Sequence, residues 1–424
     1  MLKTGKDFLW IASGQIAGLL NNFLLLKLLT SSLSMAAYGY YALWMSILLV
    51  ARQSIYDPLS IISAKETRTN FLGTEGLSSL QIVKHLTDKV AACLLLFCVI
   101  FVILEYVLFQ GIPAGMYVLA GVIYLVSNGA QGIYLNIFNI LRERKLAAAG
   151  IAADSFIKML FVILALSVFE SSLFVVICAA AVSSLVTFIC VRHVSNRLYV
   201  PVEISRSDRL AVIKNLFILS LPFVAPTLLV ALKGVGDKIF MTAFIGVEEF
   251  AAYNVLSQIG FIPMMLIIGV IQTYVSPNIY KITSSGTAAK KNTIIYLGKI
   301  IFISLSLSVV TILFSLFFSN SVVKLFVGVE YLNYSRYLPY FIAAGAFAGI
   351  AGVLNVALIG ALEPKLVGLL MLFSILLGLI TLAILILAFG FIGGIVGLVL
   401  ANLILVLLYA LALRMGAFKN SGVK

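Results

Sequence analysis

The residues of this 424-residue chain most capable of chemistry are charged side chains inside long apolar segments. A charge at the centre of a bilayer costs about 2.5–3.5 kcal/mol on insertion scales, so such residues face a bundle interior or a water-filled cavity. Five are basic and three are acidic: Lys27, Arg52, Lys158, Lys233 and Lys238, against Asp57, Asp154 and Asp237. The excess of bases predicts that they bind an anionic substrate, while the acids pair with them or bind a coupling ion.

Arg52 is the strongest single candidate among these residues. Five residues on a helix turn through about 140°, so the nearby acid Asp57 points in another direction. Arg52 therefore needs a partner from another helix or a bound anion. Its planar guanidinium suits the bidentate binding of phosphate or carboxylate. The alternative is a structural salt bridge between helices.

Two pairs of opposite charges have the i,i+4 spacing that places both groups on one helix face, Asp154 with Lys158 and Lys233 with Asp237. Each pair either neutralises itself so that the helix can enter the membrane, or it serves a substrate. Asp237 has a cation on each side and cannot neutralise both, so one positive charge remains in that span.

Lys27 lies near the outer end of the first apolar segment. It either lines a cavity or extends to the membrane interface, as long basic side chains commonly do.

Prolines and glycines interrupt two neighbouring apolar segments in the second half of the chain. The first contains Pro222 and Pro226, and the second contains Gly260 and Pro263. Proline removes an internal hydrogen bond and kinks a helix. Broken membrane helices are typical of the binding region or hinge of a transporter, and the alternative is an incidental kink repaired by neighbouring helices.

The composition of the chain indicates that these apolar segments lie in a membrane. Hydrophobic residues make up 62% of the chain and charged residues only 11%, with a net charge of +13. A soluble domain is about 25% charged, so soluble, disordered and disulfide-rich classes are excluded. Twelve segments are long and apolar enough to span a bilayer, at about 8–29, 38–63, 90–110, 115–141, 147–169, 171–191, 216–241, 250–279, 294–319, 336–360, 366–389 and 391–413.

The lysines and arginines between the spans predict the orientation. Alternate segments, beginning with the N-terminus, contain 21 basic residues, and the opposite set contains only Lys324 and Arg336. Because basic loops stay in the cytoplasm, this asymmetry predicts an even number of spans with both termini cytoplasmic.

The chain also reads as two related halves. A shift of 219 residues places Gln53-Ser54 on Gln272-Thr273 and Leu135-Asn136-Ile137 on Leu354-Asn355-Val356. Because six spans per half start both halves on the same side, the repeat is parallel. We therefore predict an all-α integral membrane fold of twelve helices in two six-helix halves, 1–191 and 216–424, joined by a cytoplasmic linker at 192–215.

No motif supports catalysis, a cofactor or a metal site. The sequence has no phosphate-binding glycine loop, no metal-ligand spacing and no C-x-x-C pair among its four cysteines. We expect the chain to be neither an enzyme nor a nucleic-acid binder.

Two short stretches carry a family resemblance. Asp237-Lys238, followed by Ile245-Gly246-Val247-Glu248-Glu249 and Tyr253, and then Leu325-Phe326-Val327-Gly328-Val329-Glu330-Tyr331, resemble the bacterial polysaccharide-export flippases. Those flippases belong to the superfamily that includes the multidrug-and-toxin antiporters and lipid II flippases. Twelve spans fit the O-antigen type better than the lipid II branch.

The resemblance implies a central cavity and transport of an undecaprenyl-diphosphate-linked oligosaccharide from the cytoplasmic to the periplasmic leaflet of the bacterial inner membrane. It implies cationic cavity residues, for which Arg52, Lys158, Lys233 and Lys238 are the candidates. Membrane lipids, a polysaccharide polymerase and a chain-length regulator would be the partners. The alternatives are a cation-coupled drug antiporter, in which Asp57, Asp154 or Asp237 would bind a proton or Na⁺, and an integral-membrane enzyme of glycan assembly.

Overall fold

The computed structural model describes most of the chain, and every regular element in the described part is a helix. The described residues are 2–69, 96, 112–140, 143–169, 171–198, 228–229, 232–283, 289–361 and 364–415. The third predicted span, 90–110, lies outside them apart from Leu96, and so does most of the predicted linker.

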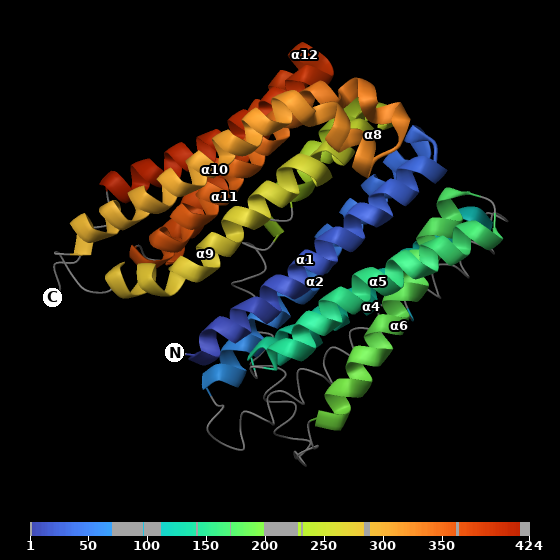
Figure 1. Ribbon diagram of the computed structural model, residues 1–424, viewed down its shortest axis with the longest axis horizontal. Coiled ribbons are helices and arrows are strands. Elements are labelled where there is room, and N and C mark those ends of the chain that lie inside the picture. Colours follow the sequence, from blue (N-terminus) through green and yellow to red (C-terminus); the bar gives the residue numbers. More distant parts are fainter. Residues whose placement is uncertain are drawn as a thin grey trace. The chain divides into compact units, whose positions relative to one another are not determined.

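The chain divides into two compact units (Figure 1). The N-terminal unit comprises Met1–Leu33 and Trp44–Leu232, and the C-terminal unit comprises Ser34–Leu43 and Lys233–Lys424. The division passes through α2 (Met35–Thr69), whose first residues belong to the C-terminal unit and whose remainder belongs to the N-terminal unit.

The N-terminal unit contains α1 (Leu2–Ser32), most of α2, α4 (Ile112–Ile140), α5 (Arg144–Val168) and α6 (Leu173–Leu198). Small residues bring its helices close together. A Cβ atom added to Gly14 of α1 would lie 2.8 Å from the Cα of Ala148 on α5. Gly129 of α4 similarly lies against the ring of Tyr56 on α2. Such close approach is how helices associate where no water drives them together.

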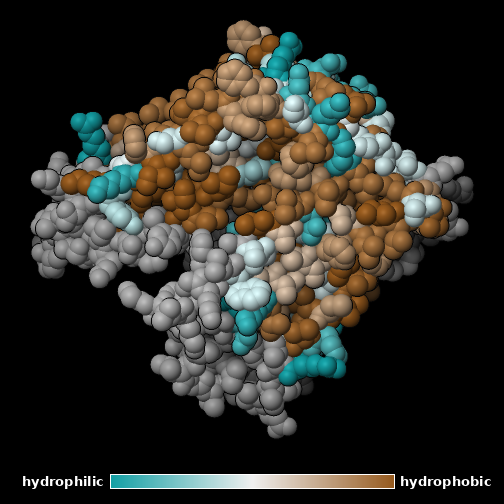
Figure 2. Space-filling model, viewed as in Figure 1, coloured by the Kyte–Doolittle hydropathy of each residue, from teal (hydrophilic) through white to brown (hydrophobic). Residues whose placement is uncertain are grey.

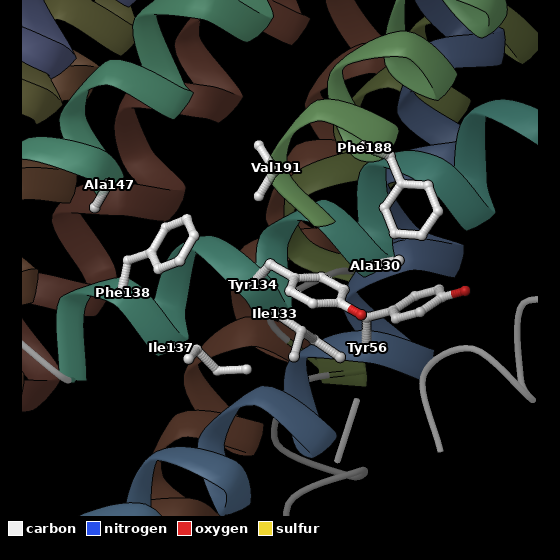
Figure 3. Packing of buried hydrophobic residues seen from close by; sticks show 9 residues of the cluster. All are labelled: Tyr56, Ala130, Ile133, Tyr134, Ile137, Phe138, Ala147, Phe188 and Val191. Atoms are coloured by element: carbon white, nitrogen blue, oxygen red, sulfur yellow. The ribbon is translucent and has the colours of Figure 1, made fainter. Parts of the chain in front are cut away.

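A cluster of buried apolar side chains joins α2, α4, α5 and α6 (Figure 3). Tyr56 and Tyr134 are each only 1% exposed, and the ring of Tyr134 lies 6.1 Å from that of Phe188. The full cluster is Tyr56, Ala130, Ile133, Tyr134, Ile137, Phe138, Ala147, Phe188 and Val191. This packing fixes α4 against its neighbours, and α4 carries polar residues of the site described below.

The C-terminal unit begins with helical residues 232–244 and continues through α8 (Val247–Leu256), the π-helix η1 (Ser257–Phe261) and α9 (Ile262–Thr283). The π-helix has a cause in the sequence. Pro263 has no N–H to bond to the carbonyl of Ile259, and just before it the N–H of Ile262 bonds to the carbonyl of Ser257, five residues back. The predicted break in this span therefore takes the form of one widened turn.

The remaining elements are α10 (Ala289–Phe326), the 3₁₀ helix η2 (Val329–Tyr337), α11 (Leu338–Ala361) and α12 (Pro364–Met415). A straight helix of the 52 residues of α12 would be about 78 Å long, far more than the bilayer core. The chain reverses at Gly390, which has φ 58° and ψ −133°. Gly378 then faces Ala401, and Gly397 faces Leu382, so residues 364–389 and 391–415 form an antiparallel hairpin.

Seven helical stretches among the described residues are long and apolar enough to cross a membrane. They are Gly115–Asn139, Arg144–Val168, Leu173–Arg197, Val247–Gln272, Ile295–Phe326, Val329–Ile359 and Val367–Arg414, the last being the hairpin of two predicted spans. Apolar residues cover much of the visible surface (Figure 2); on α10, Phe317 is 82% exposed. The chain is a multi-pass membrane protein whose described elements are all helices, and the count of twelve spans stays a prediction.

Candidate functional site

Arg52 lies on α2 in the N-terminal unit and has a partner on another helix, as its position predicts. Its guanidinium Nη1 donates a hydrogen bond to Oδ1 of Asn128 on α4 at 2.9 Å. Its Nε is buried and has no hydrogen-bond partner among the described residues. The partner is a neutral amide, so the bond orients the guanidinium without neutralising its charge.

Lys158 of α5 is bound differently. Its Nζ lies 3.9 Å from the carboxylate of Asp154, and the two side chains are 12% and 18% exposed, respectively. The same ammonium lies 3.5 Å from the hydroxyl of Tyr124 and 5.3 Å from the centroid of its ring. The i,i+4 spacing placed these two groups on one helix face, and the structure brings them into contact.

The two partners on α4 bring these basic residues to one helix face. Tyr124 and Asn128 are four residues apart, so they lie one turn apart on the same side of α4. Lys158 contacts the first and Arg52 contacts the second. Nothing in the spacing of the sequence could have identified α4 as their common neighbour.

In the C-terminal unit, Lys233 is also held by an amide. Its Nζ donates a hydrogen bond to Oδ1 of Asn402, on the second arm of α12, at 3.2 Å. Asn402 is 1% exposed, and its Nδ2 donates to the carbonyl of Leu398 at 2.8 Å. Because the amide nitrogen is fixed in this way, the amide oxygen must face Lys233.

Asp237 lies one turn from Lys233 and receives hydrogen bonds from other groups. The hydroxyl of Tyr253 donates to Oδ2 at 2.9 Å, and the backbone N–H of Lys238 donates to Oδ1 at 2.9 Å. Lys233 and Asp237 share a face, as predicted, but each forms a hydrogen bond with a neutral group. Lys238 is partly buried beside them.

A small cavity in the C-terminal unit lies against this face. It is lined by Lys233, Asp237, Ser374 and Asn402, with apolar walls that include Leu379 and Leu382. Its volume of about 30 Å³ is enough to hold water. A water could bridge the polar groups there.

Lys27 and Asp57 are partly buried on α1 and α2. The carbonyl of Lys27 accepts a hydrogen bond from the hydroxyl of Ser31 at 2.7 Å. Asp57 interacts electrostatically with Arg52 on the same helix.

A buried polar cluster in the C-terminal unit could not be found from spacing. The hydroxyl of Tyr38, at the start of α2, accepts hydrogen bonds from Asn254 at 3.1 Å and Gln258 at 2.9 Å. The ring of Tyr331 meets that of Tyr38 edge to face, 6.2 Å away. These contacts explain why the first residues of α2 belong to the C-terminal unit.

Within the described residues, no three His, Cys, Asp or Glu side chains gather closely enough to hold a metal ion.

A known protein family matches this chain. Residues 4–283 match the family model described as "Polysaccharide biosynthesis protein". Curated proteins gave no significant match to the sequence.

Solved structures share the fold at low sequence identity. A lipid II flippase in an inward closed conformation aligns with a TM-score of 0.70 and 16% identity, covering 96% of this chain and 87% of its own. An inward-facing multidrug transporter of the MATE family aligns with a TM-score of 0.67 and 13% identity, covering 97% and 96%. An outward-facing one gives a TM-score of 0.64 and 16% identity, covering 97% and 94%.

Proposed function

Because the chain belongs to the polysaccharide biosynthesis protein family, we propose that it moves an undecaprenyl-diphosphate-linked oligosaccharide across the bacterial inner membrane. The cargo would be a repeat unit of O-antigen or another surface polysaccharide, carried from the cytoplasmic to the periplasmic leaflet. Both termini would lie in the cytoplasm.

The observation that carries this proposal is the kind of hydrogen-bond partner that two intramembrane cations have. Arg52 and Lys233 are each hydrogen-bonded to a neutral amide, Asn128 and Asn402. A cation held in this way keeps its charge for a ligand, and a diphosphate is the most strongly anionic group that a polysaccharide precursor carries. Lys158 and Lys238 would add positive charge nearby in their respective units.

The fold is compatible with transport by alternating access. It is shared with an inward-facing and an outward-facing member of one transporter superfamily. Such proteins move their cargo by exposing a fixed site to each side in turn. In this scheme the basic residues bind the diphosphate, and the chain performs no bond-breaking chemistry. A polymerase and a chain-length regulator would use the delivered product.

Complementation of a deletion strain of the source bacterium tests the proposal. We expect R52A and K233A to abolish surface polysaccharide and to cause lipid-linked oligosaccharide to accumulate. K299A is the matched control, because Lys299 is an exposed basic residue on α10. The proposal is wrong if R52A and K233A, at normal membrane abundance, leave surface polysaccharide unchanged.

A second candidate is a cation-coupled multidrug antiporter, favoured by the shared MATE fold and by the buried hydrogen bond between Tyr253 and the carboxylate of Asp237. That function predicts resistance to cationic drugs when the protein is expressed in a sensitive host, and its loss in D237N. An enzyme of glycan assembly would instead convert the glycan chemically, which mass spectrometry of extracted lipid-linked intermediates would detect.

A further inference from the structure

We infer that Asn128 and Asn402 are positioning residues, which orient Arg52 and Lys233 toward an anionic substrate group without neutralising their charges. This inference rests on the proposed function and specifies how the proposed binding cations are presented. Neither asparagine is itself expected to contact the diphosphate.

In the N-terminal unit, Asn128 occupies only part of the hydrogen-bonding capacity of Arg52. The 2.9 Å bond to Asn128 uses one of the five N–H donors of Arg52. The Nε of Arg52 is buried and has no hydrogen-bond partner among the described residues, which is uncommon in native structures and calls for an explanation. A bound phosphate oxygen would satisfy such a donor. The amide therefore fixes the guanidinium while leaving donors for a ligand.

The C-terminal unit has an equivalent arrangement at Asn402 and Lys233. The side-chain amide of Asn402 is held by its bond to the carbonyl of Leu398, so its oxygen has a fixed direction. Lys233 donates to that oxygen from a different helix. Two basic residues in two units, on unrelated helices, are thus each held by a neutral oxygen.

Lys158 differs from Arg52 and Lys233 in its direct partner. This residue contacts the same face of α4, one turn from Asn128, and is paired with the carboxylate of Asp154. The fold therefore accommodates a carboxylate beside a cation next to this face of α4. An aspartate at position 128 or 402 would have nearly the shape of asparagine and would pair with the cation more strongly. An acid already acts electrostatically on each amide-held cation, Asp57 on Arg52 and Asp237 on Lys233, so an aspartate in place of the asparagine would add a second negative charge beside it.

The test replaces each asparagine by aspartate and by alanine. If the amides served only to join helices, N128D would strengthen the link to Arg52, and transport would survive. If they preserve charge, N128D folds with equal or higher thermal stability but loses at least tenfold in export. N128A, which loses only the positioning bond, is expected to lose less than N128D.

The same variants are compared by direct binding of undecaprenyl diphosphate to the purified protein in detergent. We expect N128D to weaken binding about tenfold or more, a change of about 1.4 kcal/mol. D154N added to N128D removes a negative charge nearby and is expected to restore part of the binding. N402D also loses the hydrogen bond to the carbonyl of Leu398. If N402D does not accumulate in the membrane, the results for N128D test the inference.

The outcomes separate this inference from the proposed function. If the wild-type protein neither binds undecaprenyl diphosphate nor supports export, the proposed function fails together with the inference. If the wild type does both and N128D equals it in binding and export, the inference alone is overturned. An export loss in N128A as large as in N128D, with unchanged net charge, would also overturn it.

Discussion

At the scale of single residues, the charged groups of this protein separate by the kind of partner they have. Arg52 and Lys233 have amide partners, whereas Lys158 has a carboxylate. Burying a charge is costly unless it is paired or hydrogen-bonded. Each cation is accommodated, and the direct hydrogen-bond partners of Arg52 and Lys233 leave their charges in place, although Asp57 and Asp237 lie near enough to act on them electrostatically.

The pair of Asp154 and Lys158 gives a prediction at this scale. K158M leaves the partly buried carboxylate of Asp154 without its cation, at a cost of about 1–3 kcal/mol. The double variant D154N/K158M removes both charges and should be more stable than K158M. Thermal unfolding of the purified proteins in detergent measures this order.

Export distinguishes a structural pair from a binding residue. With a structural pair, the double variant D154N/K158M retains surface polysaccharide. If the double variant is stable but abolishes export, Lys158 acts on the substrate and its pairing with Asp154 is incidental.

Sequence reasoning was most successful for residues whose partners lie within one helix. The i,i+4 spacing predicted the contact of Asp154 with Lys158 because one turn of helix fixes it. It also placed Lys233 and Asp237 on one face, but the bond of Lys233 to Asn402 spans 169 residues. Such a partner is set by helix packing, and no periodicity in one chain encodes it.

At the scale of elements, glycine and proline determine where the long helices change course. Pro263 follows a π-helical turn, and Gly390 reverses α12. Both breaks were predicted, the first as a kink and the second as the boundary between two spans. The π-helical form of the first could not be predicted, since a missing N–H can be accommodated in several ways.

Gly390 gives the prediction at this scale. Its backbone φ of 58° is one that residues other than glycine rarely adopt. G390A should therefore destabilise the protein by about 1–3 kcal/mol. Gly368, on the same element, is the matched control because a Cβ atom at either position would meet no atom within 4 Å. Thermal unfolding should show a loss for G390A and none for G368A. Equal behaviour of the two would mean that the turn tolerates a side chain.

At the scale of the whole molecule, composition and hydropathy identified a helical membrane protein, and the fold shared with solved membrane transporters agrees with that identification. Which residues group into each compact unit could not be predicted from the sequence in detail. Residues 34–43 belong to the C-terminal unit although they precede most of the N-terminal unit in the chain. Hydropathy cannot reveal this, because it records how apolar a segment is and not which helices it packs against.

The membrane orientation is the prediction at this scale. The 21 basic residues in alternate segments predict that both termini lie in the cytoplasm. Green fluorescent protein fused to the C-terminus should therefore fluoresce. Alkaline phosphatase should be active when fused after Phe169 and inactive when fused after Glu143. The reverse pattern would invert the topology.

The position of Tyr38 has a consequence for how the protein is made. Its hydroxyl binds Asn254, which lies 216 residues further along the chain. At a translation rate of about 5–20 residues per second, the ribosome needs about 10–40 s to reach that partner. During this interval the start of α2 is already synthesised while its binding partners do not yet exist. The C-terminal unit therefore contains a segment that is synthesised before most of the N-terminal unit, and this segment waits for its partners until the rest of the C-terminal unit follows.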